Sequence, residues 1–460
     1  MSFARRPDDL RSPARGAPLV FGSLRASLAA RCALRLHCAA RAFALAILFT
    51  GGCGGPEDPR TTVEFWALGR EGEVVRELVP DFERRHPDLR VHVQQIPWSA
   101  AHEKLLTAFA GGALPDAIQL GNTWVAELVA LGAIERLDDR IADSSVVRPD
   151  DWFAGVLETT RVDGSTWALP WYADTRLLFY RKDLFAAAGW SQPPQTWDEW
   201  RAALADLRRT LPPGSHPILL PITEWEMPVI LALQHGATLL RDGDRYGDFR
   251  SPAFRAGFDF YLDFFRADLA PQRGAAEIGN LYQDFAAGSF ASFASGPWSL
   301  GELARRLPPE FRDRWATAPL PAPEGPRSGV SLAGGAGLAL VRGSPRADAA
   351  WRWLEFLAEP AQQVAFHRLS GDLPARRSAW RDPSLAGSAH AQAFLIQLDR
   401  VRPTPRIPEW ERIASRIAHH AEAVVRGNES LDAALESLDR EADQVLEKRR
   451  WLLRREGQAP

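Results

Sequence analysis

The stretch LPDAIQLGNTWVAELVALGAIERLDD (114–139) contains one complete strand-and-helix unit. Ala117–Leu120 is a short apolar run typical of a buried strand, and Thr123–Leu131 carries apolar residues at helical spacing. Gly132 follows directly, where a glycine commonly ends a helix. A buried strand followed at once by a helix is the unit from which α/β sheets are built, so this stretch predicts an α/β fold.

The flanking sequence repeats the same unit in both directions. Upstream, Thr61–Ala67 and Leu89–Ile96 alternate between apolar and polar residues as strands do, and a helical pattern follows each. Downstream, Leu177–Tyr180 predicts a strand and Lys182–Ala188 a helix. Strands that alternate with helices over this length favour mixed, mostly parallel sheets flanked by helices.

Three further local features are predicted. Gly69–Gly72 (GREG) is expected to form a turn after the first strand. Thr196 and Glu199 have the spacing of a capping box, so a helix is expected to begin after Thr196. Trp315–Pro323 is expected to be a strand that becomes proline-rich towards its end.

The composition is that of a soluble globular protein. The chain has 460 residues, 46% of them hydrophobic and 25% charged, which is enough for two domains with sizeable cores. Its net charge of −3 does not favour a nucleic-acid partner. All three cysteines precede residue 54, which excludes a disulfide or a thiolate metal site in the rest of the chain.

The first 53 residues have the features of an export signal. Eight arginines accompany only two acidic residues there, and the apolar run Ala42–Phe49 follows Arg41. A basic region, an apolar run and small residues before a cleavage site are typical of a secretory signal, and eight apolar residues are too few to span a bilayer.

The end of this signal is similar to a bacterial lipobox, which implies that Cys53 is lipidated and that the protein is anchored to a membrane. Thr50 stands where that motif usually has Leu. A cleaved, soluble periplasmic protein is the alternative. Residues 54–60 begin Gly-Gly-Pro and are expected to form a tether.

Eight stretches of the chain, in order, resemble segments of the family-1 bacterial extracellular solute-binding proteins, the group that includes maltose-, trehalose- and glycerol-phosphate-binding proteins. Each stretch alone is weak, and their order and spacing carry the resemblance over roughly residues 61–450. They are FWALGREGE (65–73), LPDAIQLGNTWVAELVALGAIERLDD (114–139), WALPWYADTRLLFYRKDLFAAAG (167–189), TWDE (196–199), SGPWSL (295–300), SLAGGAGLAL (331–340), GDLPARRSAW (371–380) and PRIPEWERI (405–413).

The resemblance implies a two-lobed periplasmic-binding-protein fold of type II. Lobe one is expected to contain residues 61–172 and 318–360, and lobe two residues 173–317 and 361–460. The implied role is that of the substrate-binding subunit of an ABC importer, working outside the cytoplasm as a monomer. It would bind a sugar between the lobes and deliver it to permease subunits in the membrane, without a cofactor, a metal or catalysis of its own.

The candidate binding residues follow from the chemistry of sugars. Sugar C–H faces pack on aromatic rings, and hydroxyl groups pair with charged and amide side chains. A core position is the alternative for each ring, and a structural ion pair is the alternative for Arg176 and Glu224. The aromatic candidates, placed partly by the resemblance, are Trp124, Trp171, Tyr172, Trp225, Trp298 and Trp410.

The polar candidates flank the same motifs. Arg70 and Glu71 are expected to form a charged pair in the first ligand loop, and two glycines would allow a close approach of the backbone. The full set is Arg70, Glu71, Asn122, Asp174, Arg176, Glu224, Gly334 and Gly335.

Two other ligands or activities fit some of these residues. The arginines could hold a glycerol-phosphate-type or other polyol anion. A Trp-rich cleft is also found in glycoside hydrolases, where Glu71 and Asp174 could serve as the two carboxylates. The chain contains no Gly-x-Ser-x-Gly, His-Glu-x-x-His or P-loop motif, so the sequence favours a binding protein over an enzyme.

Overall fold

The computed structural model describes residues 58–455, and the residues from Arg60 onward form one compact unit. The expected signal segment (1–53) with Cys53, and most of the expected tether (54–60), lie outside the described residues. Within residues 58–455, no helix is both long and apolar enough to cross a membrane.

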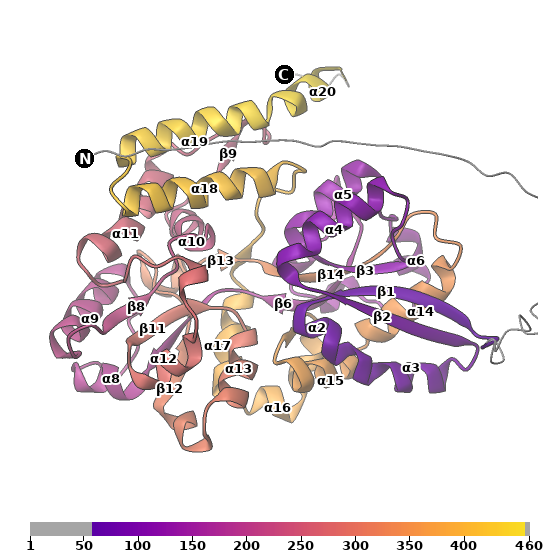
Figure 1. Cartoon of the computed structure of the whole chain (residues 1–460), viewed down its shortest axis with the longest axis horizontal. Helices are drawn as coiled ribbons and strands as arrows, with labels where there is room; N and C mark the ends of the chain where they lie inside the picture. The colour runs from indigo at the N-terminus through magenta and orange to yellow at the C-terminus, as the bar shows by residue number, and fades with distance from the viewer. Residues whose placement is uncertain (1–57, 456–460) are drawn as a thin grey trace, which may run out of the picture. The chain divides into compact units, whose positions relative to one another are not determined.

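Two separate sheets define two lobes (Figure 1). The first lobe contains a six-stranded sheet whose strands, in spatial order, are β15 (Leu373–Pro374), β6 (Leu169–Asp174), β14 (Gly334–Leu340), β3 (Ala117–Gly121), β1 (Thr61–Leu68) and β2 (Leu89–Ile96). The second contains a four-stranded sheet, in the order β12 (Trp315–Ala318), β7 (Leu177–Arg181), β11 (Phe290–Ser295) and β8 (His216–Leu219). The fold is the two-lobed α/β fold of periplasmic binding proteins.

Both sheets are mixed. Parallel pairing joins β1 to β2 and to β3, and β11 to β8. The other neighbours pair antiparallel. Most strands of each sheet nevertheless run in one direction. The strands that run the opposite way are β14 and β15 in the first sheet and β7 in the second.

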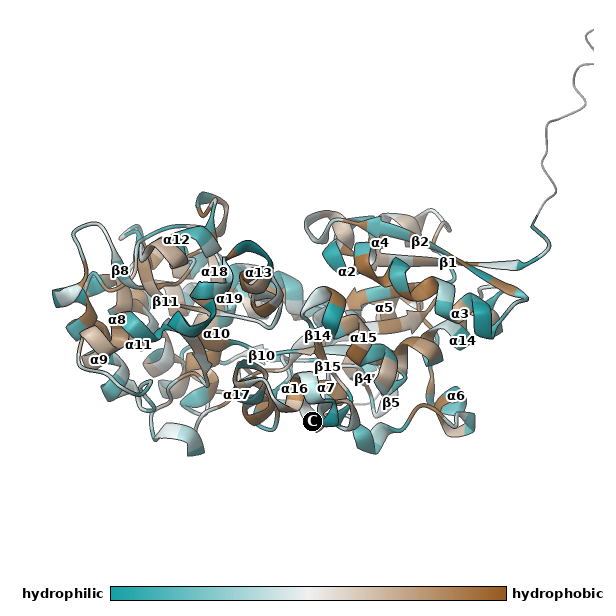
Figure 2. Ribbon diagram, turned by 90° about the horizontal axis from the view of Figure 1, so that it is seen from below, coloured by the Kyte–Doolittle hydropathy of each residue, from teal (hydrophilic) through white to brown (hydrophobic). Residues whose placement is uncertain are grey.

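Helices cover the sheets and bury their apolar faces. In the first lobe these include α4 (Trp98–Ala110), α5 (Val125–Leu131), α14 (Ala347–Ala358) and α15 (Pro360–Ser370). In the second they include α9 (Trp197–Thr210), α10 (Glu226–Gln234), α11 (Pro252–Arg266), α18 (Trp410–Val425) and α19 (Leu431–Val445). Figure 2 shows apolar colour on inner elements such as α10, α15 and β14.

Local signals explain how several helices begin and end. The capping box at Thr196 and Glu199 is present and starts α9, and Gly132 ends α5 with φ 70°. The expected turn at Gly69–Gly72 is wrong, because these residues form the first turn of helix α2 (Gly69–Val74). The strand expected at Trp315–Pro323 ends earlier, at Ala318.

The expected lobe boundaries need two corrections. Strand β15 pairs with β6 of the first sheet and α15 contacts α2, although residues 361–460 were assigned to the second lobe. Residues just after 318 remain with the second lobe, because Ala322 bridges to Thr196 at the start of α9. The chain thus passes between the lobes after β6, between β12 and β14, and between β15 and helix α17 (Ala389–Leu398).

Candidate functional site

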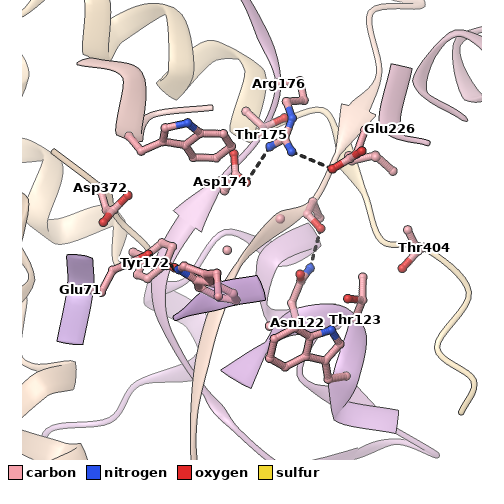
Figure 3. A pocket seen from close by; sticks show the side chains of 18 of the residues that line it. Glu71, Asn122, Thr123, Tyr172, Asp174, Thr175, Arg176, Glu226, Asp372 and Thr404 are labelled. Atoms are coloured by element: carbon pink, nitrogen blue, oxygen red, sulfur yellow. Dashed lines mark hydrogen bonds and ion pairs between the residues drawn. The ribbon is translucent and has the colours of Figure 1, made fainter. Parts of the chain in front are cut away.

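The largest concentration of predicted residues lines one cavity of about 560 Å³ between the two lobes (Figure 3). This size lies in the usual range for small-molecule sites. Its walls include the segments that follow the carboxyl ends of β1, β2, β3, β6 and β11, where α/β sheets commonly place their ligands. We call it the first cavity.

Arg176 lies at the centre of an ion-pair network in the first cavity. Its guanidinium donates to the Asp174 carboxylate at 2.9 Å and to the Glu226 carboxylate at 2.8 Å. Burial by itself would lower the pKa of Arg176, but the two carboxylates outweigh it and raise that pKa. Burial raises the pKa of Asp174, against the opposing effect of Arg176. The network fixes three charged side chains at the passage from β6 to β7.

Glu71 is held on the opposite side of the first cavity. The Tyr172 hydroxyl donates to Glu71 Oε1 at 2.8 Å, and the Trp98 indole N–H lies 3.2 Å from both carboxylate oxygens. Burial raises the pKa of Glu71. Burial also raises the pKa of Asp372 well above its usual range, and the charge of Glu71 adds to this. Figure 3 shows Glu71 and Asp372 on either side of Tyr172.

Four tryptophans contribute aromatic surface to the first cavity. Trp98 and Trp124 belong to the first lobe, and their ring centroids lie 5.6 Å apart. Trp225 and Trp298 belong to the second lobe. Trp298 is 36% exposed, and the Arg176 guanidinium lies 4.7 Å from its ring centroid.

The glycines of β14 allow this strand to pack closely on β6. A Cβ at Gly335, which has φ +120°, would lie 2.2 Å from the Tyr172 carbonyl oxygen. A Cβ at Gly334 would lie 2.9 Å from the Asp174 carboxylate. Both residues also line the first cavity, so they permit Asp174 and Tyr172 to approach β14 while leaving the cavity wall bare.

The comparisons with known proteins place this chain in a family. The model of the bacterial extracellular solute-binding proteins matches residues 66–364, which is more than half of the chain. The chain belongs to this family.

Individual relatives agree with the family. The solved structure of the sugar-binding protein MalE from Xanthomonas citri is 47% identical, with a TM-score of 0.81 over 86% of this chain and 99% of that one. The diacetylchitobiose binding protein DasA of Streptomyces coelicolor is 26% identical over 78% of this chain and 83% of its own. UgpB from Mycobacterium tuberculosis, solved with glycerophosphocholine, is 23% identical with a TM-score of 0.72 over 84% and 99%, and shares the fold.

Membership also bears on catalysis. The members of this family and the structural neighbours are substrate-binding proteins, so this solute-binding protein is not an enzyme. Within residues 58–455 there is no group of three or more His, Cys, Asp or Glu side chains able to hold a metal ion.

The structure of this solute-binding protein brings most of the predicted residues to the first cavity. Those that line it are Arg70, Glu71, Asn122, Trp124, Tyr172, Asp174, Arg176, Trp225, Trp298, Gly334 and Gly335. The Asn122 amide already donates to the Ala333 carbonyl at 2.7 Å.

Three predicted contacts are corrected. Trp171 is 1% exposed, because its ring packs in the core between Phe366, on which it stacks, and Phe65. Trp410 is fully buried and packs edge-on against Trp225, which it supports from behind. Glu224 lines a different, smaller cavity behind Arg176 and Trp298.

The expected charged pair of Arg70 with Glu71 is also corrected. Arg70 lies 3.6 Å from Glu73 and donates to the Leu369 carbonyl, whereas Glu71 bonds to Tyr172 and Trp98. The turn that was expected here is helical, so neighbouring side chains diverge around the helix.

Sequence reasoning missed several residues that line the first cavity. The available signals were their neighbours: Glu226 follows Trp225, and Asp372 lies within a stretch already matched to the family. The missed polar and aromatic residues are Trp98, Thr123, Thr175, Glu226, Glu302, Ser370, Asp372 and Thr404.

Proposed function

We propose that this protein is the extracytoplasmic substrate-binding subunit of an ABC importer, and that it binds a sugar or oligosaccharide in the first cavity. The observation that carries this proposal is the lining itself. Four tryptophans, two from each lobe, surround fixed carboxylate, guanidinium and amide groups.

That lining matches both surfaces of a sugar. The tryptophan faces offer large, rigid apolar area to the C–H faces of a pyranose. Asp174 and Glu226 accept hydrogen bonds and Arg176 donates them, and charged partners strengthen bonds to hydroxyl groups. Because Arg176 bonds to both carboxylates, their positions are set before a ligand arrives.

The named relatives point to the same class of ligand. The solved protein at 47% identity is a sugar-binding protein, and DasA binds diacetylchitobiose. A sugar is therefore the ligand class that the relatives and the cavity chemistry share.

The charge of the lining argues against the alternative, a polyol phosphate. Five carboxyl side chains line the first cavity, from Glu71, Asp174, Glu226, Glu302 and Asp372, against two arginines. Arg176 is already paired with two carboxylates, and Arg70 lies beside Glu73. An anion entering this cavity would meet an acidic lining and two arginines that already have carboxylate partners.

Delivery follows from the two-lobed site. A sugar that contacts Trp98 and Trp124 in one lobe and Trp298 in the other stabilises the arrangement in which the lobes are close together. Hinge bending about the segments between the sheets would then present a closed form to the permease, with ATP hydrolysis on other subunits.

Export, anchoring and oligomeric state complete the proposal. The protein acts in the periplasm or on the outer face of a bacterial membrane, as a monomer held by a lipid on Cys53. Growth with a radiolabelled fatty acid should label the wild-type protein and leave Cys53→Ser unlabelled. Light scattering of purified protein should give the mass of one chain, and a dimer mass would contradict the monomer.

The ligand class is tested by a thermal-shift screen against mono-, di- and trisaccharides and against glycerol-phosphate diesters. A ligand that binds only the folded protein raises the melting temperature, so at least one sugar should raise it and the diesters should not. Calorimetry on the best sugar should give one site per chain. A shift with the diesters alone would overturn the proposed sugar ligand.

A further inference from the structure

A second cavity of about 540 Å³ lies on the other side of helix α13 (Trp298–Arg306) from the first. Both lobes contribute to it. Arg70 of α2 and the end of α15 come from the first lobe, and α13, Phe311 and Trp315 come from the second. We call it the second cavity.

The second cavity is basic. Four arginines line it, Arg70, Arg305, Arg312 and Arg368, and its lining contains no carboxyl side chain. Arg70, Arg305 and Arg368 pair with Glu73, Glu302 and Asp382, which lie outside this lining. The Arg312 side chain is exposed and makes no hydrogen bond or ion pair with any residue of 58–455. An entering anion would therefore find cationic groups without a competing carboxylate in the cavity.

The floor of the second cavity is apolar and aromatic. Leu303, Phe311 and Trp315 line it, and each is almost completely buried. The His390 ring stacks on Trp315 at 3.9 Å between centroids. Burial lowers the pKa of His390, so this ring is neutral at pH 7 and adds flat surface rather than charge. Guanidinium groups together with apolar and aromatic side chains in one lining suit a ligand that is anionic at one end and apolar at the other.

The two cavities share a wall. On α13, Trp298 and Glu302 line the first cavity, whereas Leu303 and Arg305 line the second. Gly301 of α13 packs against the segment 370–371 of the first lobe, where a Cβ would lie 2.6 Å from the Ser370 carbonyl oxygen. Ser370 lines both cavities. A ligand in one cavity that shifts α13 therefore also moves the α13 side chains that line the other cavity.

We propose that the second cavity binds a small organic anion that carries an apolar group, and that its occupation strengthens binding of sugar in the first cavity. An occupant that contacts Arg70 and Arg368 of one lobe and Arg312 of the other favours the same approach of the lobes as the sugar does. By thermodynamic linkage, each ligand then raises the affinity of the protein for the other ligand by the same factor. The anion site stands by itself, and the coupling rests on the proposed sugar-binding function.

Phenyl phosphate is the probe for the anion site, because it combines a dianion with one aromatic ring. Calorimetry on the purified wild-type protein should show one site per chain. Arg312→Ala should weaken phenyl phosphate at least fivefold, and Arg312→Ala/Arg368→Ala at least twentyfold. Inorganic phosphate, which lacks the ring, and phenol, which lacks the charge, should each bind at least tenfold more weakly.

Three outcomes would overturn the anion site. They are the absence of binding, binding that Arg312→Ala leaves unchanged, and equal binding of inorganic phosphate, which would remove the role of the aromatic floor. Circular dichroism of the variants checks that they are folded, and because Arg312 is exposed and unpaired, its removal is not expected to affect folding.

The coupling is tested by titrating the best sugar with and without saturating phenyl phosphate. The sugar dissociation constant should fall at least threefold and then stay constant as more phenyl phosphate is added. A constant that rises without limit would mean that phenyl phosphate competes in the first cavity, and an unchanged constant would mean that the sites are independent. If no sugar binds at all, the proposed function fails while the phenyl phosphate titration still reports on the second cavity.

Discussion

The first and second cavities are separated by one short helix, yet their linings are chemically opposite. Five carboxyl groups and four tryptophans line the first, whereas four arginines and no carboxyl group line the second. Helix α13 contributes to both linings because Trp298 and Glu302, four residues apart, lie on one face, while Leu300, Leu303 and Ala304 lie on another and line the second cavity. Arg305, seven residues after Trp298, reaches the second cavity from the far end of the helix. The difference teaches that residues of one short helix can line two cavities of opposite chemistry, so the sequence of α13 alone does not assign a residue to either cavity.

The charges also differ in how deeply they are buried. Arg176 of the first cavity, with Asp174 and Glu226, keeps at most 20% of each side chain exposed. Arg368 of the second cavity is 58% exposed. A buried network depends on every member, because removal of one leaves charge without compensation, whereas exposed pairs are screened by solvent.

Arg176→Met should therefore have the largest effect. It leaves Asp174 and Glu226 buried without their cation, so the free energy of unfolding at pH 8 should fall by about 3 kcal/mol. Urea unfolding followed by circular dichroism measures it. Arg368→Met, in the second cavity, is the matched control and should unfold at nearly the same urea concentration as the wild type. Equal losses of unfolding free energy in the two variants would show that the charges of the two cavities do not differ in their contribution to stability.

Protonation tests the smaller cavity behind Arg176 and Trp298, which Glu224 lines. Burial, reinforced by the charge of Glu226, raises the pKa of Glu224 to about 7. Between the ordinary carboxyl pKa and this value the folded protein binds more protons than the unfolded chain, so stability falls as the pH rises through that window. Glu224→Gln should flatten this fall and stabilise the protein at pH 8 by on the order of 1–3 kcal/mol.

The control for this pH effect is Glu436→Gln, on an exposed position of α19. Thermal unfolding from pH 5 to pH 8 should show the wild-type slope in this control. A Glu224→Gln profile that stays parallel to the wild type would show that Glu224 does not titrate with folding in this range.

Trp298 tests the first cavity directly. Trp298→Ala removes aromatic surface that is 36% exposed in the cavity, and sugar affinity should fall at least tenfold, or about 1.4 kcal/mol. Isothermal calorimetry with the sugar found in the screen measures it. Trp451→Ala is the control, because Trp451 is also exposed but lies on the C-terminal helix α20 (Glu447–Arg455). Unchanged affinity in Trp298→Ala would contradict the stacking role.

The fold was predictable because it is specified by local signals and by ordered motifs. The strand at 117–121, the glycine after α5 and the capping box at Thr196 are each determined by a few neighbouring residues. The lobe boundary near 360 was not predictable in this way. It depends on β15 pairing with β6, two segments about two hundred residues apart in the chain.

The sequence predicted which loops form the candidate site better than it predicted which side chains of those loops line the cavity. Trp171 and Tyr172 are adjacent on β6, and the packing of Trp171 against Phe65 and Phe366 decides that the tyrosine lines the cavity. Glu224 and Glu226 flank Trp225, and only the start of α10 decides that Glu226 meets Arg176. Which residue of each pair lines the cavity depends on tertiary packing, and tertiary packing cannot be read from the spacing of residues in the sequence.

Gly301 tests whether the two cavities act through their shared wall. In Gly301→Ala the new methyl group would lie 2.6 Å from the Ser370 carbonyl oxygen and 3.2 Å from Gly371 Cα, so α13 must move away from the first lobe. Because Trp298 and Arg305 move with the helix, affinities for sugar and for phenyl phosphate should both weaken, by about threefold, or roughly 0.7 kcal/mol.

Gly279→Ala is the matched control, since a Cβ there has no atom within 4 Å. It should change neither titration. If Gly301→Ala weakened only the sugar, α13 would position the first cavity alone, and the second cavity would be independent of the approach of the lobes. If both affinities fall together, the contact of Gly301 with residues 370–371 is the physical link between an acidic, Trp-lined cavity and a basic one.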